Sequence, residues 1–266
     1  MTPPPEELVR PGECHVWTAR AVSVRASGAP ALLKLLDAGE RARYEAFLRD
    51  EPRGLYLTAH ALLRDLVGAQ LDLDPAEPSF AAVCRTCTSG GHGKPVLPGS
   101  PLHLSLSHAG DQVAVALTYA GPVGVDIEEI GRVGDPPLTV LSAEERAAYD
   151  RLPAGERAGG FTRYWARKEA VLKATGDGLS VDPALLTVSA PDAPAALLSW
   201  AERAQPHPPV RLYDVPAPDD YAAAVAVLGD GCRVVRHEVA YDGDGVLRRP
   251  RRAGDGVLRR PRRAGD

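Results

Sequence analysis

Apolar and polar side chains alternate in two short stretches near the middle of the chain, residues 102–107 and 123–128. Successive side chains of a strand point to opposite faces, so each stretch predicts a strand with one apolar and one polar face. A turn at Asp111, followed by an apolar run over 112–119, makes the first stretch one arm of a hairpin.

The rest of the chain mixes helical and strand patterns without the regular rhythm of a doubly wound sheet. Residues 38–71 are helical in pattern, with a break near Glu51-Pro52 and a looser pattern from Gly68, and the capping-box sequence Ser142–Glu145 predicts the start of another helix. The other predictions are a helix over 160–175, strands over 15–24, 185–189, 221–228 and 232–241, and a loop rich in Gly, Pro and Cys over 80–100.

A change of pattern at Gly121-Pro122 divides the chain into two halves, each with a helical stretch and several antiparallel strands. We therefore expect an α+β fold of two similar lobes, with residues 1–120 in the N-terminal lobe and residues 121–242 in the C-terminal lobe. The chain has 266 residues, 44% of them hydrophobic, which is enough to build both cores.

Neither the hydropathy nor the charge of the chain favours a membrane or a nucleic acid. No run approaches the roughly 20 apolar residues needed to cross a bilayer, and the N-terminus lacks the features of a signal peptide, so we expect a cytoplasmic protein. The net charge is -4, and residues 243–266 contain eight Arg and three Asp. The preceding body is therefore acidic, which argues against a general nucleic-acid-binding surface.

The Arg-rich end is a duplication, because residues 243–253 recur unchanged at 254–264. Two polar copies cannot form the shared apolar core of a repeat protein, so we expect a disordered tail whose deletion leaves activity intact. An alternative makes this tail a nucleic-acid-binding arm.

The chain contains four cysteines, and two of them form a Cys-x-x-Cys pair, Cys84 and Cys87. His92 follows as a third potential zinc ligand, but no second Cys-x-x-Cys completes a site. Reduced thiols on a loop are the default interpretation, and structural zinc is the alternative.

The segment 165–173 combines several kinds of chemistry on one face of a predicted helix. Five residues fall within an arc of roughly 140°, namely Trp165, Lys168, Glu169, Leu172 and Lys173. A helix that only covers a core keeps its charges away from the apolar stripe, so the mixture indicates a site. The alternative is a surface ion pair between Glu169 and Lys173.

Two further groups carry candidate chemistry. Asp126 and Glu128 project from the same face of a strand about 7 Å apart and could converge on Mg²⁺, with Glu169 as a third carboxylate. An isolated Asp-x-Glu is more often a solvated strand face. Ser107-His108 lies where a strand meets a turn, but adjacent residues cannot form a hydrolase pair, and Lys94 belongs to no phosphate-binding loop motif.

The order of these motifs is specific. Gly93-Lys94-Pro95, Ser107-His108, Gly124 to Glu128 and Trp165-x-x-Lys168-Glu169-x-x-x-Lys173, followed by Gly176 and Gly178, together resemble the 4'-phosphopantetheinyl transferase superfamily, in particular the surfactin-synthetase-activating type. The resemblance spans roughly residues 15–240. It implies a pseudo-dimer of two similar α+β lobes with the active site in the cleft between them.

The resemblance also implies the reaction. An Mg²⁺-dependent transferase of the holo-[acyl-carrier-protein] synthase type would move the phosphopantetheine arm of coenzyme A to a serine of an apo acyl- or peptidyl-carrier protein, releasing adenosine 3',5'-bisphosphate. Carried over by motif position, the metal ligands are Asp126, Glu128 and Glu169, the catalytic residues are Glu169 and Lys173, and the residues around coenzyme A are Arg53, Lys94, Ser107, His108, Trp165, Lys168 and Lys173.

The match leaves several points open. Ala166 stands where the family often has a hydroxyl residue, and Arg49, His60 and Arg64 compete with Arg53 as the contact of the 3'-phosphate. The carrier and its pathway are unreadable, although secondary-metabolite or siderophore synthesis is expected, and one chain with both lobes would act as a monomer. The leading alternative is a non-catalytic module that binds coenzyme A or a carrier protein.

Overall fold

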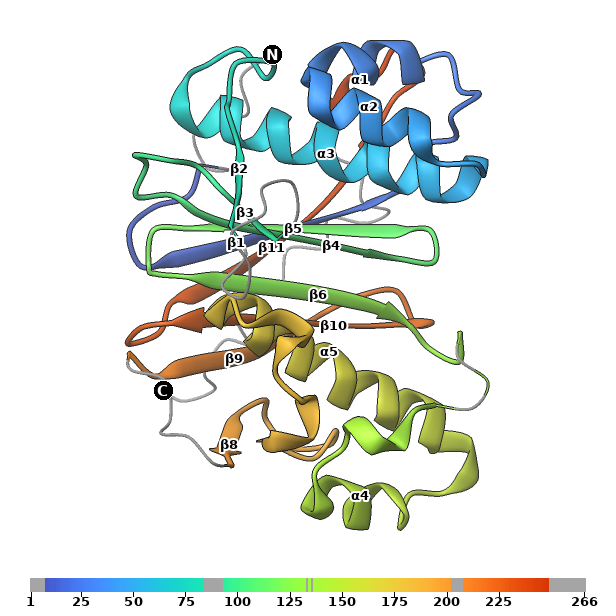
Figure 1. Cartoon of the computed structure of the whole chain (residues 1–266), viewed down its shortest axis with the longest axis vertical. Coiled ribbons are helices and arrows are strands. Elements are labelled where there is room, and N and C mark those ends of the chain that lie inside the picture. Colours follow the sequence, from blue (N-terminus) through green and yellow to red (C-terminus); the bar gives the residue numbers. More distant parts are fainter. Residues whose placement is uncertain (1–7, 84–92, 133, 135, 202–207, 249–266) are drawn as a thin grey trace, which may run out of the picture.

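The protein consists of two facing β-sheets, each covered on its outer side by helices (Figure 1). The computed structural model describes residues 8–83, 93–132, 134, 136–201 and 208–248. None of its helices within these residues is long and apolar enough to cross a membrane. The Cys84, Cys87 and His92 group lies outside the described residues.

The first sheet has five strands in the order β12-β11-β1-β5-β4. Strands β4 and β5 form the hairpin that the alternating pattern predicts, and the parallel partner of β1 is β11. The strands of this sheet are β1 (Glu13–Arg20), β4 (His103–Ala109), β5 (Gln112–Thr118), β11 (Arg233–Tyr241) and β12 (Leu247–Arg248). Its covering helices are α1 (Ala29–Leu35), α2 (Ala38–Ala46) and α3 (Asp50–Leu71).

The second sheet has three antiparallel strands in the order β6-β10-β9 and packs against the long helix α5. Its elements are β6 (Val123–Glu129), β9 (Val210–Val215), β10 (Tyr221–Leu228) and α5 (Arg157–Thr175), with α4 (Ala143–Tyr149) beyond them. Two small hairpins complete the fold, β2 (Ala81–Val83) with β3 (Lys94–Val96) and β7 (Leu186–Val188) with β8 (Leu197–Trp200). Short 3-10 turns occur at Leu138–Val140, Ala154–Glu156, Gly178–Ser180 and Pro183–Leu185.

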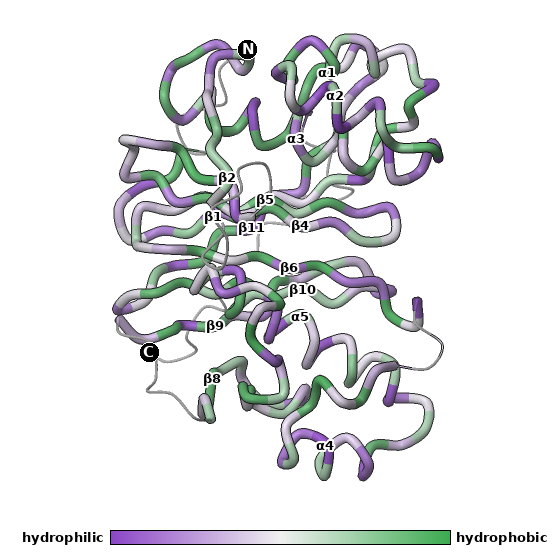
Figure 2. Tube along the Cα trace, viewed as in Figure 1, coloured by the Kyte–Doolittle hydropathy of each residue, from purple (hydrophilic) through white to green (hydrophobic). Residues whose placement is uncertain are grey.

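Burial follows this layering, and Figure 2 shows the hydrophobic positions gathered along the central strands. One core lies between the two sheets, where Val16 of β1 packs with Val125 of β6 and Val225 of β10. A second core joins the first sheet to α3, and a third joins the second sheet to α5. The sheets are thus sandwiched between helices, and the α+β class expected from the sequence is confirmed.

Local patterns place most elements correctly, with small shifts at their ends. The capping box at Ser142 and Glu145 is present, with each side chain bonded to the other residue's backbone N–H. The helical break lies at 47–49 rather than at Glu51-Pro52, and Pro52 sits inside the first turn of α3. A proline is tolerated there because the first backbone N–H groups of a helix have no partner within it. The segment 80–100, predicted as a loop, contains the short strands β2 and β3, and the sequence patterns do not predict α1, β8 and β9.

Strand β11 crosses from the second half of the chain to the first sheet. Although the predicted C-terminal lobe runs to residue 242, β11 pairs with β1 in the first sheet, with Glu13 opposite Arg233. The boundary near residue 120 stays a prediction, but residues 233–241 lie with the N-terminal half. The predicted disordered tail also needs correction, because residues 247–248 form β12 against β11 and the Ser27 hydroxyl donates to the carbonyl of Gly243.

Candidate active site

The site is built where helix α5 packs closely on strand β6. A Cβ atom at Gly124 would collide with the backbone of Ala170 and Ala174 and with the side chain of Lys173, so only glycine permits this approach. The contact places Glu169 and Lys173 of the helix beside the polar face of the strand. The glycine in the Gly-Val-Asp-Ile-Glu sequence therefore sets the helix-to-strand spacing on which the site depends.

Asp126 is the buried centre of this cluster. Only 1% of its surface is exposed, and its Oδ1 atom accepts from Lys173 Nζ at 2.6 Å and from the Ser107 hydroxyl at 2.7 Å. Lys173 also donates to Ser107 Oγ at 2.9 Å. Because Ser107 belongs to β4, this triangle connects the first sheet with the strand and helix of the second half.

Two other carboxylates lie within electrostatic reach of Asp126. Burial and the Asp126 carboxylate raise the pKa of Glu128 to about 7, and the Trp165 indole donates to Glu128 Oε1 at 3.1 Å. The pKa of Glu169 is also raised, first by burial and then by Asp126. Three acidic groups so close together repel one another unless a cation accompanies them.

Two oxygens of this cluster are buried without a hydrogen-bond partner, Asp126 Oδ2 and Glu169 Oε1. Such orphaned acceptors are rare in proteins and call for an explanation. Among the described residues, no three acidic, His or Cys side chains are already arranged to hold a metal ion. The donor set nevertheless suits a hard cation, since it consists of three carboxylates, and two of them have a buried oxygen without a hydrogen-bond partner. The chemistry of these residues therefore fits Mg²⁺.

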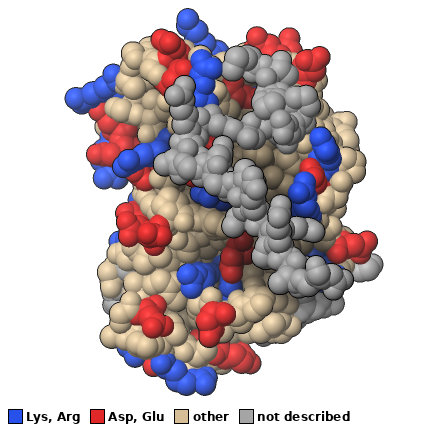
Figure 3. Space-filling model, turned by 180° about the vertical axis from the view of Figure 1, so that it is seen from behind, with Lys and Arg blue, Asp and Glu red and all other residues tan. Residues whose placement is uncertain are grey.

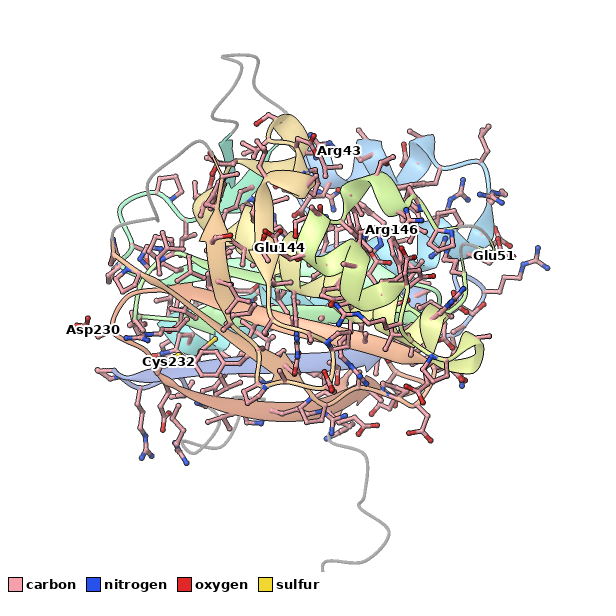
Figure 4. The ribbon with its side chains drawn as sticks, turned by 90° about the horizontal axis from the view of Figure 1, so that it is seen from below. Arg43, Glu51, Glu144, Arg146, Asp230 and Cys232 are labelled. Atoms are coloured by element: carbon pink, nitrogen blue, oxygen red, sulfur yellow. The ribbon has the colours of Figure 1, made fainter. Side chains whose placement is uncertain are left out.

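A hollow of about 770 Å³ opens on one side of the cluster, bordered by Glu169 and Lys173. Lys94, His60 and Arg43 also line it. Figure 4 labels Arg43, which extends from α2 near the end of α5. Figure 3 shows acidic and basic groups interspersed on the rear face of the protein.

The cations of this hollow are held by specific contacts. Lys94 Nζ donates to the carbonyl of Val123 at 2.7 Å, and burial lowers its pKa to about 8. His60 Nδ1 lies 2.9 Å from Glu40 Oε1, and its ring stacks on Tyr56 with centroids 4.0 Å apart. An imidazolium in this position would donate to Glu40 through one nitrogen and keep the other available for an anion.

The structure does not bring Arg53 into the hollow. Its guanidinium donates to the carbonyl of Phe47 and lies 5.4 Å from the centre of the Tyr44 ring. Arg64 is fully buried and bonded to Asp37 and Glu40. Among the basic residues that the sequence offers for the 3'-phosphate, His60 is therefore better placed than Arg53, because it lines the hollow. The sequence does not indicate Arg43, because only the packing of α2 brings it to the hollow.

Lys168 also departs from its expected role. Its side chain is fully buried, its ammonium lies 2.6 Å from Glu145 Oε2, and it donates to the carbonyls of Pro183 and Leu186. These contacts consume its three N–H donors. Lys168 thus braces α5 against α4 and the following turn, and it is not available to a phosphate.

A second hollow, of about 620 Å³, lies on the other side of the cluster. It is bordered by His108, Glu128, Trp165, Arg132 and Phe161. Burial and the positive charge of Lys173 lower the pKa of His108. The carboxylate cluster therefore borders both hollows, through Glu169 in the first and Glu128 in the second.

The chain is similar to known proteins over most of its length. Residues 122–226 match the family described as the 4'-phosphopantetheinyl transferase superfamily. The chain is 30% identical over 237 residues to the 4'-phosphopantetheinyl transferase HetI of Nostoc sp., in an alignment that covers 86% of this chain and 93% of that relative. This alignment includes most of both halves.

Other relatives share shorter segments. The 4'-phosphopantetheinyl transferase psf-1 of Bacillus pumilus is 40% identical over 97 residues, covering 34% of this chain and 39% of the relative. The 4'-phosphopantetheinyl transferase AcpT of Salmonella typhimurium is 38% identical over 112 residues, covering 38% and 58%. Among solved structures, the Thermotoga maritima holo-[acyl-carrier-protein] synthase aligns with 23% identity and a TM-score of 0.33, over 41% of this chain and 63% of that chain.

Proposed function

The chain belongs to the 4'-phosphopantetheinyl transferase superfamily, and we propose that it transfers the 4'-phosphopantetheine arm of coenzyme A to a serine of an apo carrier protein. Adenosine 3',5'-bisphosphate is the second product. The observation that carries the proposal is the pair of orphaned oxygens, Asp126 Oδ2 and Glu169 Oε1, beside the Lys173 ammonium. Anion-binding hollows and unused carboxylates together suit phosphoryl-group chemistry.

Asp126, Glu128 and Glu169 are the residues that would hold Mg²⁺. When bound, the ion would neutralise charge on the pyrophosphate of coenzyme A as the leaving bisphosphate departs. Lys173 supplies a second positive charge at the same place, because its ammonium already lies against Asp126. Ser107 orients both groups through its hydroxyl.

Glu169 is the proposed base for the serine hydroxyl of the carrier. Its raised pKa makes it a better proton acceptor than an exposed glutamate, and its Oε1 atom has no other hydrogen-bond partner in the structure. As a proton passes to this oxygen, the serine oxygen can attack the phosphorus. Trp165 restricts the position of Glu128 through its indole N–H.

The hollow with Lys94 is the proposed site of the nucleotide. The Lys94 ammonium, the Arg43 guanidinium and the His60 ring line it together, which suits the 3'-phosphate and the pyrophosphate. The hollow with His108 and Trp165 then faces the acceptor, and its apolar wall can contact the pantetheine chain. This arrangement keeps the two substrates on opposite sides of the carboxylates.

A cytoplasmic monomer that serves secondary-metabolite or siderophore synthesis remains our proposal for the setting of this reaction. One chain supplies residues from both sheets to the site, Ser107 from the first and Asp126 from the second, so no second copy is needed. The carrier protein and its pathway follow from no residue described above.

Calorimetric binding of coenzyme A tests the metal component. Mg²⁺ should tighten binding at least tenfold for the wild type and for Asp150→Asn, an exposed control, because a bound cation screens the pyrophosphate from the carboxylates. Asp126→Asn should lose this response. If the wild type binds coenzyme A with the same affinity with and without Mg²⁺, the proposal that these carboxylates hold the metal is wrong.

A further inference from the structure

Two cysteines that the transfer reaction does not use lie close together on the first sheet. Cys14 is in β1 and is fully buried, whereas Cys232 is half-buried and directly precedes β11. These strands are parallel neighbours, with Glu13 opposite Arg233. Figure 4 shows Cys232 at the end of the molecule where the chain enters β11, beside the strand β1.

The two thiols belong to the same hydrophobic cluster in the core between the sheets. Cys14 lies opposite Val234 of β11, two residues along the chain from Cys232. The interaction with Cys14 lowers the pKa of the Cys232 thiol, and the Tyr213 hydroxyl lowers it further. Tyr213 Oη also accepts from the backbone N–H of Cys232 at 3.2 Å, which fixes the loop beside the thiol.

The pair has the asymmetry of a reactive and a resolving cysteine. Cys232 is the more accessible thiol and the more readily ionised, which are the properties that favour oxidation. The neighbouring Cys232 sulfur and burial raise the pKa of Cys14, so this buried residue is the less readily ionised of the two.

We propose that Cys14 and Cys232 form an oxidisable dithiol whose oxidant is hydrogen peroxide. The Cys232 thiolate attacks one peroxide oxygen, so that an S–O bond forms, the O–O bond breaks and hydroxide leaves as water after protonation. The Cys14 sulfur then attacks the sulfenic sulfur, the S–O bond breaks, and the Cys14 proton departs with that oxygen as a second water. Two thiols lose two electrons, and one peroxide becomes two waters.

The disulfide would tie the start of the first sheet to the point where the chain returns to it. Because the two cysteines are far apart in sequence, the bond closes a loop that contains most of the chain, including both halves of the proposed active site. Cross-links over long loops restrict the unfolded state most strongly. Oxidation should therefore raise the melting temperature by several degrees, roughly 5–10 °C, provided that the bond forms without strain.

Thiol trapping in a Cys84→Ser/Cys87→Ser background tests this inference, because only Cys14 and Cys232 then remain. After treatment with one equivalent of hydrogen peroxide, the unfolded protein should contain no thiol that reacts with N-ethylmaleimide. Intact-protein mass spectrometry should show that the protein mass has decreased by the mass of two hydrogens. Peptide mapping should recover a peptide pair joining positions 14 and 232, and dithiothreitol should restore both thiols.

Two matched variants separate the roles of the cysteines. In Cys14→Ala, the Cys232 sulfenic acid should persist and react with dimedone, whereas Cys232→Ala should leave Cys14 unoxidised under the same conditions. Retention of both thiols in the parent, oxidation of Cys14 before Cys232, or a disulfide between two molecules would each overturn the proposal. These readouts are independent of carrier modification, so they hold whatever the outcome for the proposed function.

Discussion

Lys173 Nζ lies 2.6 Å from Asp126 Oδ1, and this ion pair is the point where the long helix of the second half meets the polar face of β6. The same ammonium donates to Ser107 of the first sheet. A cation in contact with a buried carboxylate and an adjacent hydroxyl is well placed to exchange partners when an anionic substrate arrives. Asp126 would then be free to contact a metal ion through both oxygens.

Glu169→Gln should separate binding from chemistry. The amide keeps the shape of the side chain but cannot accept the serine proton, so we expect coenzyme A affinity to change by less than about tenfold and kcat to fall by about 100-fold or more. Calorimetry and single-turnover carrier modification measure the two quantities. Glu144→Gln, on the exposed first turn of α4, is the matched control and should leave both unchanged. Near-normal turnover in Glu169→Gln would refute the role of Glu169 as base.

Lys168→Met should affect stability rather than substrate binding. Removing one partner of the buried Lys168–Glu145 pair leaves the other charge uncompensated, at a cost of about 3–5 kcal/mol of unfolding free energy. Thermal unfolding should show this loss, and Lys168→Met/Glu145→Gln should recover part of it. Folded Lys168→Met, assayed at low temperature, should keep its KM for coenzyme A. An unchanged melting temperature with a raised KM would restore the phosphate-binding role that the helical pattern predicts.

His60→Gln should weaken recognition of the 3'-phosphate. The KM for coenzyme A should rise about tenfold, because a charge-assisted hydrogen bond is lost, whereas the KM for 3'-dephospho-coenzyme A should hardly change. Arg53→Gln serves as the control, since the Arg53 guanidinium is directed to the Phe47 carbonyl. If Arg53→Gln raises the KM for coenzyme A but not for 3'-dephospho-coenzyme A, and His60→Gln does not, Arg53 rather than His60 contacts the 3'-phosphate.

Asp65 should make stability depend on pH. This carboxyl accepts from Tyr241 Oη at 2.6 Å, and burial raises its pKa to about 6. The folded state therefore binds the Asp65 proton more tightly than the unfolded state does, so the contribution of Asp65 to stability is fully present below pH 4 and is lost as pH rises to 6, by up to about 3 kcal/mol. Denaturant unfolding gives the free energy of unfolding of the wild type and of Asp65→Asn, and the difference between the two should change between pH 4 and 6. A difference that stays constant over this range would contradict the raised pKa of Asp65.

The sequence predicted those parts of the protein that depend on neighbours along the chain. The alternation over 123–128 correctly placed Asp126 and Glu128 on one face of β6, and the helical spacing brought Glu169 and Lys173 to that face. Both patterns have a short period, and the apolar side of each is buried. Local periodicity therefore specified the centre of the site.

The errors concern contacts between distant segments. Lys168 and Lys173 lie at opposite ends of the roughly 140° arc, and packing turns the first toward Glu145 while the second reaches Asp126. Likewise, the choice between Arg53 and His60 depends on how α2 packs against α3. The crossing of β11 to the first sheet depends on pairing with a strand more than 200 residues away. None of these relationships has a local signal.

Intact-protein mass spectrometry of an apo carrier protein, incubated with the protein, coenzyme A and Mg²⁺, tests the central claim most directly. The carrier should gain the mass of one phosphopantetheine arm, EDTA should abolish the gain, and excess Mg²⁺ should restore it. The absence of any gain on peptidyl, polyketide and fatty-acid carriers, despite measurable coenzyme A binding, would contradict the account and favour a non-catalytic binding module.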